Sequence, residues 1–278
     1  MDIPARPPSY AEHRPDPRLR DEVACYWTLV GSLPRGFRGS DVVVPDAAMD
    51  LLFDLLEGDG RLVGTMTRPL RVRRAAGVAH LGVRFLPGAG SAWAGVAADE
   101  VTDSSVALTL LDGAYEGWGP RLADCATVDR ALSLIDRLLV ARRAACAPRT
   151  DLGMLRVANA IRRSGGRASV VELARSVGVG RRQLERRFRA SVGLSPKQMG
   201  RVVRFQRAID LLLEAPATPL ASIAVRCGYF DQAHFGAEFR RLAGEPPGAY
   251  RRRRLAEGIR GGRDADVAFL QDAARARG

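Results

Sequence analysis

Residues 220–239, LASIAVRCGYFDQAHFGAEF, have the pattern of a helix-turn-helix motif. A short apolar segment containing Ile223 and Ala224 is followed by Gly228, and then by a segment in which Phe235 and Phe239 lie one helical turn apart. A small alanine lets two helices cross closely, and a glycine permits the sharp turn between them. The stretch therefore predicts two short helices joined by a tight turn, with the phenylalanines on the buried side.

The same pattern occurs earlier in the chain, in VVELARSVGVGRRQLERRF at residues 170–188. One short helix pair with a glycine turn is common, but two in one region are a much stronger indication of a double helix-turn-helix domain. Ser169 with Glu172, and Ser195 with Gln198, each have the spacing of a helix-capping box. The second box begins a long helix over about residues 197–214, which would join the two motifs.

The joining helix has a length that suits DNA. About 18 residues at ~1.5 Å per residue give roughly 27 Å, and the flanking turns add to this. Two recognition helices held this way can lie about one DNA turn (~34 Å) apart and enter successive major grooves. A single chain would then do what a dimeric repressor does with two.

The charge is concentrated in the same half of the chain. Residues 1–150 contain 18 arginines against 19 acidic residues, whereas residues 151–278 contain 25 basic residues against 12 acidic ones. A net charge of +13 on the second part accounts for the +12 of the whole chain. A basic module beside a neutral one indicates a polyanion partner, namely a nucleic acid. With the two helix-turn-helix patterns, the expected partner is double-stranded DNA.

Composition excludes several other classes. The 278 residues, 46% hydrophobic and 27% charged, are typical of a soluble protein with two cores. No run approaches the roughly 18 apolar residues of a membrane span, and residues 1–20 lack the apolar segment of a secretory signal. We therefore expect a cytoplasmic protein with no membrane partner.

Nothing in the sequence indicates a catalytic or metal centre. The four cysteines form no CxxC pair, and the three histidines lie far apart in the sequence. There is no Walker loop and no HExxH motif. We expect no catalytic residue, no metal and no cofactor.

The first half reads as a β-rich domain after a proline-rich, loose leader of about 20 residues. Short apolar or alternating runs broken by Gly, Pro and Asp predict six strands, at 23–31, 41–45, 50–56, 61–66, 70–74 and 79–85. Residues 128–144 predict an amphipathic helix, whose apolar stripe suits either packing on the sheet or self-association. The expected fold class is α+β, with a small N-terminal sheet or barrel and an all-α C-terminal part.

Residues 151–253 resemble the DNA-binding domain of AraC/XylS-type transcription regulators. The resemblance rests on LARSVGVGRRQLERRFRASVGLSPKQM (173–199), RFQRAIDLLLEA (204–215) and IAVRCGYFDQAHFGAEFRRLAGEPPGAYRR (223–252). The first half is similar, more weakly, to the sensor region of one branch of these regulators. The resemblance implies a sensor domain at 1–147 and a DNA-binding domain at 148–254. The tail at 255–278 lies beyond the resemblance, and its apolar spacing at Val267, Leu270 and Ala274 predicts a short helix.

The resemblance also implies which side chains contact DNA. In the first recognition helix these are Arg181, Arg182, Glu185 and Arg186, since arginine grips guanine and glutamate accepts from cytosine. In the second they are Gln232, Ala233, His234 and Ala237, and Lys197 is placed to contact phosphate. The family often has arginine where Ala237 stands, so the first helix is predicted to discriminate more strongly than the second.

For the first domain the implied role is to sense a small-molecule effector. The side chains expected to line such a pocket are Trp27, Phe53, His80, Arg84 and Trp93, although for any one of them a plain β core is the favoured interpretation. A homodimer through the N-terminal domain is a further expected partner, as is RNA polymerase if the chain is an activator.

Two alternative functions remain open at this point. AraC-type helices also occur in DNA-alkylation repair proteins, but the reactive Pro-Cys-His-Arg sequence of those enzymes is absent here. A sequence-neutral architectural DNA binder would show little difference in affinity between operator and random DNA.

Overall fold

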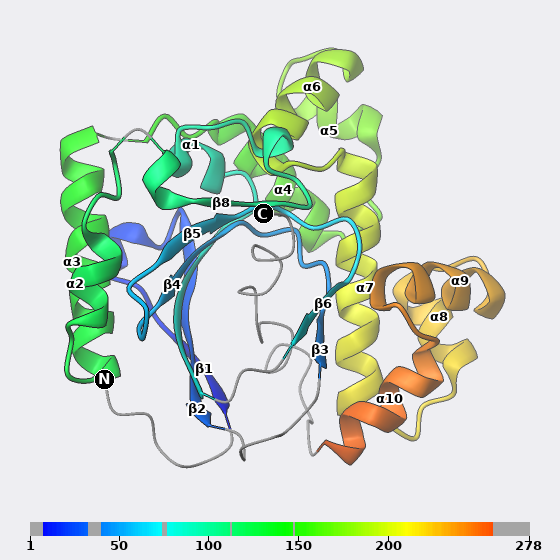
Figure 1. The fold of residues 1–278 in the computed structure, drawn as a ribbon. Helices are drawn as coiled ribbons and strands as arrows, with labels where there is room; N and C mark the ends of the chain where they lie inside the picture. Colours follow the sequence, from blue (N-terminus) through cyan, green and yellow to red (C-terminus); the bar gives the residue numbers. More distant parts are fainter. Residues whose placement is uncertain (1–7, 33–39, 74–76, 112, 147, 258–278) are drawn as a thin grey trace.

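The computed structural model describes residues 8–32, 40–73, 77–111, 113–146 and 148–257. A curved antiparallel sheet with helices on its outer side is followed by a cluster of helices arranged around one long helix (Figure 1). The predicted α+β class is confirmed. Residues 258–278, which hold the whole of the predicted tail helix, lie outside the described residues.

The N-terminal half contains a large and a small sheet. The large sheet has the order β1-β2-β7-β4-β5-β8, and all its described pairs are antiparallel. Its strands are β1 (Ser9–His13), β2 (Val23–Ser32), β4 (Asp50–Asp54), β5 (Gly60–Val63), β7 (Gly77–Phe85) and β8 (Ser105–Ala107). The small sheet pairs β3 (Ser40–Val43) with β6 (Leu70–Arg73). All six predicted strands are present, whereas β1 forms within the leader that was expected to be loose.

Both faces of the large sheet are apolar because both are covered. Alternation along β4 places Leu51 and Phe53 on one face and Leu52 on the other, and all three are buried. The outer face packs beneath α1 (Gly90–Ala94), α2 (Trp118–Ala123) and α3 (Val128–Cys146). The inner face packs toward β3 and β6.

Helix α3 uses its apolar stripe on its own sheet. Ala131, Ile135 and Leu139 are fully buried in the outer core. Of the two roles predicted for this stripe, packing within the chain is therefore the one observed.

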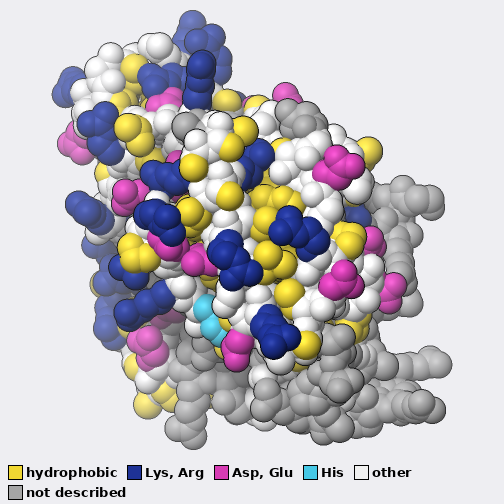
Figure 2. Space-filling view, turned by 90° about the vertical axis from the view of Figure 1, so that its left-hand side faces the viewer, with side chains coloured by type: hydrophobic (Ala, Val, Ile, Leu, Met, Phe, Trp, Pro, Cys, Tyr) yellow, Lys and Arg dark blue, Asp and Glu magenta, His cyan; other side chains and the backbone are white. Residues whose placement is uncertain are grey.

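Basic and acidic side chains are interspersed on the face of the molecule seen from the α3 side (Figure 2). Short 3-10 turns complete this half, at Pro17–Leu19 (η1), Ala98–Glu100 (η2) and Leu108–Leu110 (η3).

The C-terminal half is helical throughout. Its helices are α4 (Leu152–Arg163), α5 (Val170–Ser176), α6 (Arg181–Val192), α7 (Pro196–Glu214), α8 (Leu220–Cys227), α9 (Gln232–Ala243) and α10 (Pro247–Ala256). The capping box of Ser195 and Gln198 forms as predicted, but Ser169 makes no side-chain capping bond to α5. No helix among the described residues is long and apolar enough to cross a membrane.

Helix α7 belongs to two separate cores. Met199 and Val202, in its first half, pack with α4, α5 and α6. Phe205, Ile209 and Leu212, in its second half, pack with α8, α9 and α10. Because one continuous helix is part of both cores, the two helix-turn-helix units are joined rigidly rather than by a linker.

The connection between β3 and β4 also reaches both cores. Val44 packs with the second unit and Ala47 with the first. Between them, Gln206 Nε2 of α7 donates a hydrogen bond of 2.6 Å to the carbonyl oxygen of Pro45. The N-terminal half thus rests along the joining helix.

Candidate nucleic-acid interface

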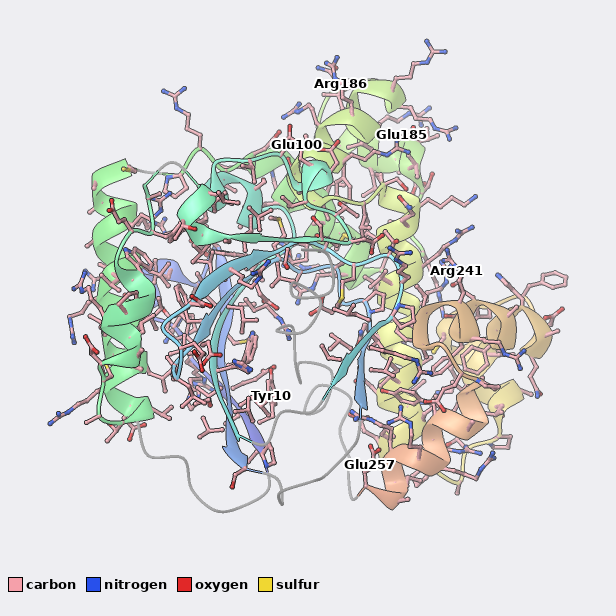
Figure 3. The ribbon with its side chains drawn as sticks, viewed as in Figure 1. Tyr10, Glu100, Glu185, Arg186, Arg241 and Glu257 are labelled. Atoms are coloured by element: carbon pink, nitrogen blue, oxygen red, sulfur yellow. The ribbon has the colours of Figure 1, made fainter. Side chains whose placement is uncertain are left out.

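The first recognition helix, α6, has one buried face and one basic face. Leu184 and Phe188 are fully buried, which orients the helix on the first core. The opposite face exposes four arginines and a glutamine: Arg181, Arg182, Gln183, Arg186 and Arg189. Arg186 projects away from the body of the molecule (Figure 3). This face can grip phosphates or the acceptor edge of guanine.

Glu185 is the one acidic side chain on this helix, and it is partly engaged. Arg181 Nε donates to Glu185 Oε1 at 3.0 Å, one helical turn apart. A pair this exposed contributes at most about 1 kcal/mol, so DNA can displace it at low cost. Glu185 therefore stays available to accept from a cytosine amino group.

The second recognition helix, α9, begins as the sequence predicts. The Asp231 carboxylate accepts from the backbone N–H of His234 at 2.7 Å and caps the helix. Phe235 and Phe239 are fully buried, and Gln232, Ala233, His234 and Ala237 are exposed. All four predicted residues are therefore accessible to a partner.

His234 is turned partly toward the protein. Its ring meets that of Tyr229 edge-on at 5.6 Å, and Nε2 lies 4.0 Å from Glu238 Oε2. Gln232 makes no such contact and is the freer polar side chain on this face.

Glu238, which the sequence did not single out, fixes the second recognition helix on α7. It is a buried carboxylate, and it lies 3.4 Å from both Arg201 Nε and Arg204 Nη2. Arg204 also donates to the carbonyl oxygen of Gly166, between α4 and α5, at 3.0 Å. Arg204 thus connects the two helix-turn-helix units, and Arg201, which is half-buried, is held against Glu238. Lys197, in the first turn of α7, is exposed.

The N-terminal half holds the far end of α6. Thr65 is fully buried and its hydroxyl donates to the carbonyl oxygen of Val192 at 2.7 Å. Thr102 Oγ1 lies 3.0 Å from the carbonyl oxygen of Gly193, the glycine that ends α6 with φ of +80°. A Cβ at Gly193 would lie 2.6 Å from Thr102 Oγ1, so the contact has no room for a side chain. We call these contacts the α6 clamp.

Comparison with known proteins agrees with this geometry. Residues 173–253 match the family described as a helix-turn-helix domain, and residues 11–107 match a domain of unknown function (DUF6597). Over 84 residues the chain is 39% identical to a putative AraC-like transcription regulator of Streptomyces lividans, covering 30% of this chain and 27% of that protein. It is 33% identical over 84 residues to the HTH-type transcriptional regulator MtrA of Neisseria gonorrhoeae, covering 30% of this chain and 28% of that protein.

This chain carries an AraC/XylS-type DNA-binding domain.

A solved structure is also similar to part of this chain. The DNA-binding domain of AdpA, crystallised in complex with a target DNA, is 30% identical, with a TM-score of 0.35, over 37% of this chain and 94% of that one. The two curated regulators are matched over less than a third of their own length.

The residues predicted for an effector pocket are not brought together. Trp27, His80 and Arg84 lie on the inner face of the sheet, because β7 pairs with β2 so that Trp27 lies opposite Gly82, and residues 80, 82 and 84 share a face. Phe53 and Trp93 are in the core on the outer face. The sheet itself separates the two groups, and both tryptophans are fully buried.

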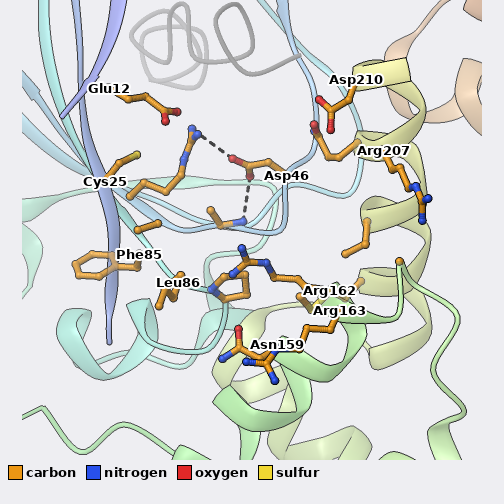
Figure 4. Close-up of a pocket in the computed structure, with 18 residues that line it drawn as sticks. Glu12, Cys25, Asp46, Phe85, Leu86, Asn159, Arg162, Arg163, Arg207 and Asp210 are labelled. Atoms are coloured by element: carbon orange, nitrogen blue, oxygen red, sulfur yellow. Dashed lines mark hydrogen bonds and ion pairs between the residues drawn. The ribbon is translucent and has the colours of Figure 1, made fainter. Parts of the chain in front are cut away.

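A cavity of about 690 Å³ lies between the sheet and the AraC-type domain, and of the five predicted residues it is lined by Arg84 alone (Figure 4). Arg84 lines its sheet side with Cys25 and Asp46, and Arg163 and Arg207 line its helical side. Its volume is in the range of small-molecule sites. The effector nevertheless stays a prediction.

Two carboxylates hold the Arg84 guanidinium in place. Nη2 lies 3.3 Å from Asp46 Oδ2, and Nε lies 3.3 Å from Asp50 Oδ1. Burial raises the pKa of Asp50 to about 6, with nearby Asp46 adding to the rise and Arg84 opposing it. Arg84 is thus already neutralised by the protein.

Proposed function

We propose that the chain is a sequence-specific DNA-binding transcription regulator. The observation that carries this proposal is the pair of exposed recognition faces, on α6 and α9, attached to the two halves of one 19-residue helix. At about 1.5 Å per residue that helix is roughly 28 Å long, which supports insertion into successive major grooves about 34 Å apart. After position 150 the chain contains 25 basic and 12 acidic residues, and this positive charge favours a polyanion as the partner.

In this proposal each predicted residue has a role in recognition. Arg182 and Arg186 grip guanine, Glu185 accepts from cytosine, and Gln232 pairs with adenine. Arg181 and Lys197 contact phosphates and set the register. His234, with Ala233 and Ala237 beside it, faces the second groove.

We further propose that the domain boundary lies near residues 147 and 148, that the N-terminal half modulates DNA binding, and that the regulator acts in the cytoplasm without catalysis. A small-molecule effector, a homodimer and RNA polymerase remain predicted partners. The α6 clamp supports modulation, since it joins the N-terminal half to the first recognition helix.

Selection from a random DNA pool with the purified full chain tests the proposed function. We expect enrichment of an asymmetric site with two different boxes about one DNA turn apart. The double variant Arg182→Ala/Arg186→Ala should lose the enrichment of one box only. Retention of DNA with no enriched sequence would instead indicate an architectural binder, and would contradict the proposal.

A further inference from the structure

Phe230, in the turn before α9, is an apolar side chain left in water. It is 90% exposed, more than any other large hydrophobic residue among those the structure describes. Its neighbour Tyr229 is buried, and so is Phe235 one turn into the helix. Isolated exposed apolar residues are common on protein surfaces. The exposure of Phe230 therefore indicates a binding role only together with its position in the fold.

The position is one that helices normally use for packing. Phe230 immediately precedes the capping residue Asp231, and a hydrophobic residue there often packs onto the fourth residue of the helix, here Phe235. In this chain Tyr229 takes that role, with its ring centroid 5.1 Å from that of Phe235. Phe230 therefore contributes little to the helix start.

The backbone around Phe230 is nonetheless well fixed. Gly228 ends α8 in the left-handed conformation, and the N–H of Tyr229 donates to the carbonyl oxygen of Ala224 at 3.0 Å. On the other side of Phe230, Asp231 is held by the hydrogen bond that caps α9. The side chain is thus presented from a rigid turn at the end of the helix that would enter the groove.

The first two turns of this face carry no arginine or lysine, and the exposed arginines of α9, Arg240 and Arg241, lie in its last turn. Gln232, Ala233 and Ala237 are exposed, and a Cβ built at Gly236 would meet open space. The corresponding face of α6 carries arginines. A helix start without arginine or lysine is poorly suited to guanine, whereas an A·T pair offers adenine N6 and N7 to a glutamine and the thymine C5-methyl group to an apolar side chain.

We propose that Phe230 packs on the C5-methyl group of a thymine in the box bound by α9. This inference rests on the proposed function and adds a specificity-determining residue to it. The two boxes would then differ in chemistry, with guanine and cytosine contacted by α6, and adenine and a thymine methyl group contacted by α9.

Deoxyuridine substitution tests this contact directly, since it removes only the methyl group and leaves the base pair intact. Each thymine of the selected α9 box is replaced in turn, and affinity of the full chain is measured by fluorescence anisotropy. At one fixed thymine we expect a loss of about fourfold, the value for one methyl group returned to water.

The variant Phe230→Ala should bind the thymine operator more weakly and should no longer distinguish thymine from deoxyuridine at that position. Leu110→Ala removes an exposed leucine from the N-terminal half and is the matched control. Both the control and Arg186→Ala should keep the fourfold discrimination.

The outcomes separate this inference from the proposed function. If the chain enriches no DNA sequence, the proposed function fails and the inference fails with it. If a two-box operator is found but no deoxyuridine substitution matters, or Phe230→Ala keeps the discrimination, only the thymine contact is overturned. A Phe230→Ala variant with unchanged affinity and lost promoter activation also overturns it, and indicates a protein partner at this turn.

Discussion

Arg186 and Gln232 show at the scale of single residues how the two recognition helices differ. Both side chains are exposed on the outward face of their helix. A guanidinium brings a charge and two donors to guanine, whereas a carboxamide brings a neutral donor and acceptor to adenine. The charged contact is also shorter and stronger, so it should contribute more to discrimination.

We therefore expect Arg186→Ala to weaken binding to the selected operator by about 1–3 kcal/mol and Gln232→Ala to weaken it less. Gel-shift titrations at fixed salt measure both. Arg130→Ala, an exposed arginine on α3, controls for the change in net charge. A far larger loss for Gln232→Ala than for Arg186→Ala would reverse the ranking.

His80 makes the stability of the N-terminal half depend on pH. Burial lowers its pKa to about 4 from the usual 6.5. As the pH falls below 6.5 the unfolded chain takes up this proton and the folded chain does not, so stability is lost between pH 6.5 and 4, by up to about 3 kcal/mol. Asp50 acts oppositely, because a raised pKa contributes stability that is lost as the pH rises through about 6.

The difference in the free energy of unfolding between wild type and His80→Gln isolates the contribution of the histidine. In urea unfolding we expect the free energy of wild type minus that of the variant to fall by about 3 kcal/mol from pH 7 to pH 4. Leu110→Ala, which changes an exposed side chain without a titratable group, should show no comparable change. A flat difference for His80→Gln would mean that the folded protein accepts the proton.

At the scale of elements, sequence patterns predict the helices far better than their contacts. The repeat of Leu173-Ala174 in Ile223-Ala224 was sufficient to place both motifs, because each motif is local in sequence. The capping hydrogen bond predicted for Ser169 does not form, although its spacing from Glu172 is correct. Such a bond depends on the side-chain rotamer, which spacing in the sequence does not determine. The predicted pocket failed to assemble because strand pairing, unreadable from one sequence, decides which residues share a face.

The α6 clamp could not be predicted for the same reason. Thr65 and Val192 are 127 positions apart, and nothing in either local sequence indicates the other. The contact nevertheless links the sheet to the end of a recognition helix. Its loss should therefore loosen the last turn of α6.

Thr65→Val preserves shape and removes the donor to Val192. We expect a loss of about 1–3 kcal/mol in unfolding free energy, the usual cost of an unmet buried hydrogen bond. Hydrogen exchange should also speed up at the last amides of α6, including that of Gly193. Thr109→Val, at an exposed threonine, is the control. Unchanged exchange in α6 would show that the clamp does not restrain the helix.

At the scale of the whole molecule, helix α7 sets the distance between the two recognition helices. It contributes residues to both helical cores and contacts the β3–β4 connection through Gln206. A rigid separation of this kind should be matched by a fixed separation of the two boxes on DNA.

Insertions between the boxes test this rigidity. Five added base pairs turn the second box to the opposite face of the duplex, and ten restore the face but move the box by about 34 Å. We expect both insertions to reduce affinity to that of a single box, as measured by titration with the full chain. Wild-type affinity for the ten-base-pair insertion would show that the two units move independently.

The unlike faces of α6 and α9, fixed at opposite ends of α7, also give the protein a direction. A symmetric dimer on a palindrome reads the same from either strand, so its site has no left or right. Here, turning the operator end for end would leave the affinity unchanged, but would carry the sheet and its cavity to the other side of the site. At a promoter, inverting the operator would therefore place the sheet and its cavity on the side away from the promoter.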